Sequence, residues 1–97
     1  MKLKLYSIYD KKSESYSKPF DAYNDNCAKR MVAASMDEAS LLRKYPTDYR
    51  LDNIGTFDDQ TGQFENWSEK VIVSEVSNLV PLAIVGDGTN VGEGKVL

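Results

Sequence analysis

The stretch KLKLYSIY, residues 2–9, shows a two-residue period near the start of the chain. In an extended backbone this period puts alternate side chains on opposite sides: Lys2, Lys4, Tyr6 and Ile8 on one, and Leu3, Leu5, Ser7 and Tyr9 on the other. Such alternation predicts a β-strand with one buried face. The polar residues 10–14 then favour a turn, and Ser15 to Phe20 is expected to return as a short second strand. Because proline has no N–H to donate, Pro19 confines this second strand to an edge or an end.

A helix is expected next, because Asn24 and Asp25 are good N-cap residues and an apolar stripe follows them to about Met36. One or two further helical turns are predicted over residues 37–44. Pro46 should end them, because it disfavours helical geometry at the residue before it.

From Tyr49 the pattern returns to strand, and Gly55 marks a bulge or a close approach of backbone. Residues 58–62, DDQTG, predict a turn, and Gln63 to Trp67 predicts the partner strand of a second hairpin. The β-branched run at residues 71–73 lies beyond this hairpin.

The order ββαββ predicts an α+β fold, with a small antiparallel sheet of two hairpins and one main helix packed on one face. We expect a folded core over residues 1–67, an additional strand or short helix over 68–85, and a flexible, glycine-rich tail over 86–97. The exposed sheet edges favour a homo-oligomer, formed by edge pairing or by exchange of a tail strand.

Several functional classes are disfavoured by composition. The chain has no histidine and one cysteine, Cys27, so a histidine-based catalytic unit and an intramolecular disulfide cannot form. Residues 58–62 do not fit a calcium loop, and GDGTNVGEGK at residues 86–95 lacks the spacing of a phosphate-binding loop. We therefore expect a binding protein rather than an enzyme, with no metal or cofactor. The apolar segment 79–85 is too short to span a bilayer, so no membrane partner is expected.

Charge is divided unevenly along the chain, whose net charge is −3. Residues 1–50 hold 10 Lys and Arg against 7 Asp and Glu, whereas residues 51–97 hold 2 against 8. Seven of the ten aromatic residues also lie in the first half. Stacking aromatic rings combined with basic side chains are typical of proteins that bind single-stranded nucleic acid.

The candidate nucleic-acid-binding residues are basic or aromatic and come from this first half: Lys2, Lys4, Tyr6, Lys11, Lys12, Tyr16, Lys18, Lys29 and Arg30. Lys2, Lys4 and Tyr6 come first, because they should share one face of the first strand. The competing interpretation is that such tyrosines pack between strands and that Lys29 and Arg30 belong to a solvated helix face.

Five segments carry a resemblance to a known family: MKLKLYSIYD (1–10), PF (19–20), ND leading into AKR (24–30), KYPTDYRL (44–51) and IGTFDDQTGQFEN (54–66). Together they cover roughly residues 1–67, and in this order the chain resembles a nonstructural protein of gokushovirus-type microviruses, which are single-stranded DNA phages.

The resemblance implies a DNA-binding protein in the cytoplasm of an infected bacterium. Single-stranded DNA is expected to be its ligand rather than double-stranded DNA. The resemblance also implies a role in genome replication or in the switch to packaging. The acidic balance leaves a second hypothesis open, an adaptor that homo-oligomerises and engages a phage or host replication protein.

Overall fold

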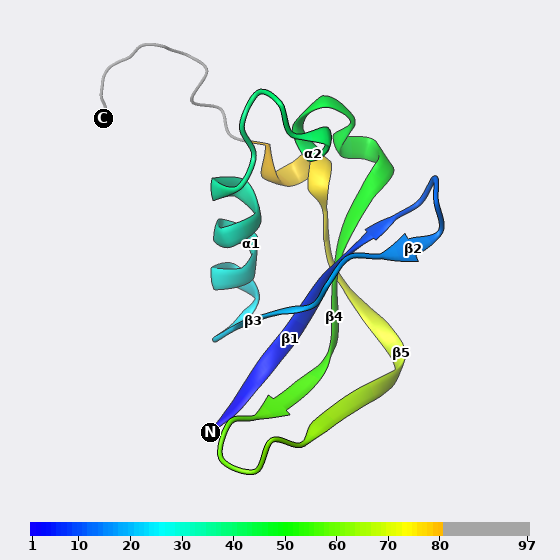
Figure 1. Cartoon of the computed structure of the whole chain (residues 1–97). Coiled ribbons are helices and arrows are strands. Elements are labelled where there is room, and N and C mark those ends of the chain that lie inside the picture. The colour runs from blue at the N-terminus through cyan, green and yellow to red at the C-terminus, as the bar shows by residue number, and fades with distance from the viewer. Residues whose placement is uncertain (81–97) are drawn as a thin grey trace, which may run out of the picture.

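The structure is a computed structural model of the 97-residue chain, and it describes residues 1–80 (Figure 1). The elements follow in the order β1 (Lys2–Asp10), β2 (Ser15–Tyr16), β3 (Phe20–Ala22), α1 (Asp25–Ala34), α2 (Leu41–Lys44), η1 (Pro46–Asp48), β4 (Tyr49–Asp58), β5 (Phe64–Glu75) and η2 (Val76–Leu79). The tail predicted over 86–97 and the end of the segment predicted over 68–85 lie outside the described residues.

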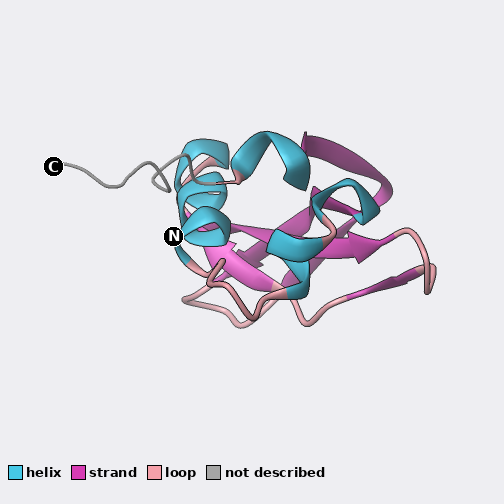
Figure 2. Cartoon of the chain, turned by 90° about the horizontal axis from the view of Figure 1, so that it is seen from above, coloured by secondary structure: helices cyan, strands magenta, loops and turns pink. Residues whose placement is uncertain are grey.

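All five strands join one antiparallel sheet in the order β2-β1-β4-β5, with β3 also paired to β1. The helices form a second layer on one side of this sheet (Figure 2). The predicted α+β class, with two hairpins and one main helix, is therefore confirmed. The opposite side of the sheet is called the helix-free face below.

The strand expected over Ser15 to Phe20 is two short strands, β2 and β3, and both pair with β1. Between them the Ser17 N–H donates to the Ile8 carbonyl at 2.8 Å, and the Ser17 hydroxyl accepts from the Ile8 N–H at 3.0 Å. The side chain of Ser17 thus replaces a main-chain partner of β1. Pro19 follows without an N–H of its own, so the regular ladder is interrupted there.

Helix α1 begins as predicted, because the Asn24 side chain accepts from the Cys27 N–H at 2.8 Å. It ends at Ala34, two residues earlier than expected, where the Ser35 hydroxyl donates to the Val32 carbonyl. Of the turns predicted over residues 37–44, only α2 is helical, and the Ser40 hydroxyl accepts from the Leu42 N–H in its first turn.

The β4–β5 hairpin confirms the predicted turn and the role of Gly55. The Gly62 N–H donates to the Asp58 carbonyl at 2.8 Å, and Gly62 has the positive φ of 78° that glycine tolerates. A Cβ at Gly55 would lie 2.1 Å from the main-chain oxygen of Glu65, so the two strands approach too closely there for a side chain.

The second hairpin is longer than predicted, because β5 continues through Trp67 to Glu75 instead of ending there. Val76, just beyond it, is fully buried in the hydrophobic core. β5 therefore runs across the boundary expected after residue 67. The β-branched run at 71–73 is part of β5, and the short helix η2 follows it.

Tyr6 lies at the centre of the core and is fully buried, together with Leu51, Ala28 and Val32. Its hydroxyl donates to Asp25 at 2.7 Å, which links the central strand to the first turn of α1. Tyr6 therefore faces the helix layer rather than solvent. The side of β1 that carries Tyr6 and Ile8 is the side that packs against the helices.

Strand β5 forms one edge of the sheet. Four of its residues, 67–70, are inserted between the positions opposite Gly55 and Asn53, which breaks the regular ladder with β4. The Lys70 ammonium donates to the Trp67 carbonyl at 3.0 Å. Irregular backbone and a lysine are two features that protect sheet edges from pairing with another chain.

Candidate nucleic-acid interface

An aromatic stack lies on the helix-free face, at the end of the sheet where β1 and β2 meet. Tyr9 of β1 stands directly opposite Tyr16 of β2 and also directly opposite Arg50 of β4. All three side chains therefore lie on the same face of the sheet. The Tyr9 and Tyr16 rings lie 4.8 Å apart, tilted by 50°, and the Arg50 guanidinium lies 4.7 Å from the centre of the Tyr9 ring. Tyr16 is 40% exposed, so part of this stack is open to a ligand.

Asp52 holds Tyr16 and Arg50 of this stack in place through hydrogen bonds. Its carboxylate is fully buried and accepts from Arg50 Nε at 2.8 Å, from Arg50 Nη2 at 2.9 Å and from the Tyr16 hydroxyl at 2.7 Å. The hydrogen bond to Asp52 raises the pKa of Arg50, and burial together with Asp52 raises the pKa of Tyr16. Both groups therefore keep their protons at neutral pH, and the Arg50–Asp52 pair has no net charge.

Two predicted cations border the stack. Lys12 and Lys18 are exposed, and no salt bridge within residues 1–80 involves either of them. Lys12 lies in the turn between β1 and β2, and Lys18 follows β2 by two residues. Tyr16, Lys12 and Lys18 are thus the predicted residues that the hairpin brings to one end of the molecule.

Lys11 has a structural partner instead. Its ammonium binds the Glu75 carboxylate and donates to the Thr47 carbonyl at 3.1 Å. These contacts attach the first hairpin to the end of β5. They also mean that the charge of Lys11 is already compensated in the folded chain.

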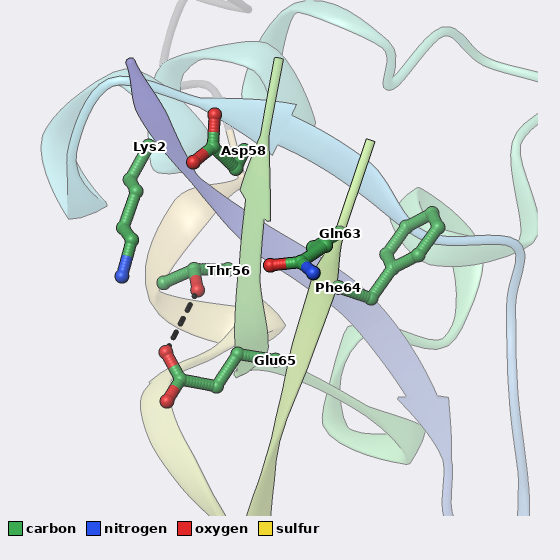
Figure 3. A pocket seen from close by; sticks show the side chains of 6 residues that line it. All are labelled: Lys2, Thr56, Asp58, Gln63, Phe64 and Glu65. Carbon is green, nitrogen blue, oxygen red and sulfur yellow. Dashed lines mark hydrogen bonds between the residues drawn. The ribbon is translucent and has the colours of Figure 1, made fainter. Parts of the chain in front are cut away.

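Lys2 lies at the far end of the sheet, in a shallow pocket of about 260 Å³ (Figure 3). Residues of the second hairpin complete its lining: Thr56, Asp58, Gln63, Phe64 and Glu65. Lys2 stands directly opposite Asp58. A hydrogen bond from the Gln60 main chain lowers the pKa of Asp58, so this carboxyl stays ionised. A phosphate next to Lys2 would meet negative charge.

The remaining predicted cations do not share the helix-free face. Lys4 stands opposite Ala22, which packs in the core beneath the helices. Lys29 and Arg30 belong to α1, which covers the other side of the sheet. Tyr6 is buried, so its assignment as an exposed stacking residue is wrong.

Two residues of the stack, Tyr9 and Arg50, were not predicted from the sequence. Tyr9 and Tyr6 lie on opposite sides of β1. The sequence pattern favoured the side of Tyr6 as the binding side, so Tyr9 was not among the candidates. Arg50 arrives from β4, forty-one positions away, through the long-range pairing of β1 with β4. The YR pair at residues 49–50 was visible, but nothing local places it beside the first hairpin.

No cluster of three or more acidic or cysteine side chains suited to a metal ion occurs within residues 1–80. In the same range, no helix is long and apolar enough to cross a membrane.

The protein is a small α+β domain, and one face of its sheet carries aromatic and cationic side chains. The chain belongs to the family of the phage ORF5 protein, whose model matches residues 3–79. This match covers all the described strands and helices except the first residue of β1. No curated protein and no solved structure matches the chain.

Proposed function

We propose that this phage protein binds single-stranded DNA, without catalysis, on the helix-free face of its sheet. The observation that carries the proposal is the stack of Tyr9, Tyr16 and Arg50, which is held rigid by the buried Asp52. The resemblance to a nonstructural protein of single-stranded DNA phages supports the same ligand. The setting would be genome replication or the switch to packaging, in the cytoplasm of the infected bacterium.

Stacking explains why a single strand is the preferred form. Each base that stacks on an aromatic side chain contributes about 1–3 kcal/mol, and a guanidinium adds a cation–π contribution. Tyr16 offers its ring only to a base that is not already stacked inside a duplex. Lys12 and Lys18 at the border would hold the phosphates.

The number of available cations predicts a moderate dependence on salt. If Lys12 and Lys18 each contact one phosphate, log K should fall with log salt with a slope of about −1.4, since each contact on a single strand contributes about −0.7. Between about 50 and 200 mM salt, affinity should then fall roughly 7-fold. A protein held mainly by phosphate contacts would lose far more.

The test is fluorescence anisotropy with labelled single- and double-stranded oligonucleotides at these two salt concentrations. Tyr16→Ala should weaken binding to single strands about 5- to 100-fold, which corresponds to the loss of one stacked base. Tyr23→Ala is the matched control, because Tyr23 is 71% exposed but lies between β3 and α1. Equal binding by both variants and the wild type, or no binding by the wild type, would refute the proposal.

A protein adaptor remains the second candidate, and the exposed apolar side chains of β5 favour it. Val71 and Ile72 are 54% and 59% exposed, next to the acidic Glu69. Such a surface would suit a replication protein of the phage or host, or a second copy of the chain. Changing both residues to Ser should then abolish partner capture, or lower the mass measured by light scattering, while Tyr16→Ala should not.

A further inference from the structure

A second aromatic pair lies at the other end of the sheet. Phe57 stands directly opposite Phe64, and their ring centres are 5.0 Å apart with a tilt of 41°. Phe64 is 65% exposed, although a large apolar side chain gains by burial. Figure 3 shows its ring pointing away from the side chains of Lys2, Thr56 and Glu65.

Strand alternation puts this pair on the same face as the first stack. Leu3 and Tyr9 are six positions apart on β1, so their side chains point to the same side. Leu3 stands opposite Phe57, and Tyr9 stands opposite Arg50. β4 contains one extra residue, Ile54, between these two positions, and this insertion keeps Phe57 and Arg50 in phase.

The acidic residues near the second pair belong to the other side. Glu65 stands opposite Thr56, Asp58 stands opposite Lys2, and these positions alternate with Phe64 and Phe57. Their carboxylates therefore point away from the face that carries the rings. Lys2 and Glu65, drawn in Figure 3, lie together on that other side.

The surface between the two pairs carries one acidic side chain without a salt bridge among its opposed residues. One row contains Asp21, Leu5, Gly55 and Asn66, and the next contains Ser7, Asp52 and Ile72. Asp21 is exposed on β3, at one margin of the face, whereas Asp52 is buried and paired with Arg50. Six residues of β1 separate the ends, which corresponds to roughly 20 Å of strand.

We infer that the Phe57–Phe64 pair is a second stacking site, so that one strand of single-stranded DNA crosses the whole helix-free face from Tyr16 to Phe64. The inference rests on the proposed function and adds the path and the minimum length of the ligand. A short oligonucleotide would occupy only the end that also offers cations, whereas a longer one would reach both aromatic pairs.

The experiment measures binding of the full chain to oligothymidylates of about 4 and about 16 nucleotides, the range of site sizes found for comparable binding domains. Phe64→Ala should weaken binding of the longer probe about 5- to 100-fold and leave the shorter probe within about twofold. Tyr16→Ala should weaken both probes, and Tyr23→Ala neither. Phe64→Leu keeps apolar bulk without a ring, so it should behave as Phe64→Ala does.

Thermal unfolding shows whether each variant is folded. Both Phe64 variants should be folded, because the Phe64 side chain is 65% exposed. The inference is overturned, and the proposed function kept, if Phe64→Ala binds the longer probe like the wild type while Tyr16→Ala does not. Wild-type affinity in Phe64→Leu would also overturn it, because bulk alone would then suffice. If neither Tyr16→Ala nor Phe64→Ala weakens the longer probe, the inference and the proposed function both fail.

Discussion

Replacing Asp52 by Asn should destabilise the fold, although the two side chains have nearly the same shape. The amide oxygen can still accept from Arg50 Nε, but an NH2 group in place of Oδ2 can no longer accept from Arg50 Nη2 or from the Tyr16 hydroxyl. The Tyr16 hydroxyl oxygen can instead accept from the new NH2 group, so the net loss is the charge-assisted hydrogen bond from Arg50 Nη2, which costs about 2 kcal/mol. At roughly 4–8 °C per kcal/mol for a domain of this size, the melting temperature should fall by about 8–16 °C.

A double-mutant cycle provides the assay. Asp52→Asn, Arg50→Ala and the double variant are unfolded by heat and by urea, with Asp21→Asn as the control because Asp21 is exposed. The coupling between Asp52 and Arg50 should reach at least about 1 kcal/mol, because Arg50→Ala leaves a buried carboxylate without its partner. A fall in melting temperature below about 4 °C for Asp52→Asn, or additive effects in the cycle, would refute this account of the stack.

Three further variants test the core, the close approach of strands and the edge. Burial and the hydrogen bond to Asp25 raise the pKa of Tyr6, so the folded state keeps a proton that the unfolded chain releases above about pH 10. The contribution of Tyr6 to the free energy of unfolding is fully present below that pH and is lost as the pH rises further. In urea unfolding at alkaline pH, Tyr6→Phe should therefore lose less stability with rising pH than the wild type. Gly55→Ala should cost at least about 2 kcal/mol in urea unfolding because of the contact with Glu65, clearly more than Gly62→Ala, where a Cβ has open space but an unfavourable φ. Lys70→Val should raise the mass measured by light scattering at high concentration, because it removes the edge lysine and extends an exposed β-branched run. A mass equal to that of the wild type would contradict the protective role.

The sequence was sufficient to predict several features that depend on local chemistry. The period of β1, the cap at Asn24, and the turn ending at Gly62 each depend on residues close together in the chain, and all three are observed. Gly55 was predicted as a bulge or a close approach of backbone, because glycine inside a strand often marks one of these. Local patterns of this kind are decided by backbone geometry and hydrogen bonding within a few residues.

Features that depend on pairing between distant segments were not predictable in the same way. Alternation shows that β1 has two sides, but only the position of α1 decides which side is buried, and Tyr6 was therefore placed on the wrong one. The length of β5 depends on β4, which continues to pair with it after the four inserted residues. Arg50 and Tyr9 meet only because β4 lies beside β1 in one register.

The net charge of −3 argued against DNA binding when only the sequence was considered, but the structure shows where the negative charge lies. Asp52 is neutralised by Arg50, and Glu75 by Lys11, so neither opposes a phosphate at the aromatic stack. Asp58 and Glu65 of the second hairpin lie on the side opposite the rings. A face that combines stacking rings with only a few cations should bind weakly but tolerate salt, because stacking does not release counterions. Acidity of the whole chain and binding of single strands are then compatible, provided that the bases rather than the phosphates supply most of the affinity.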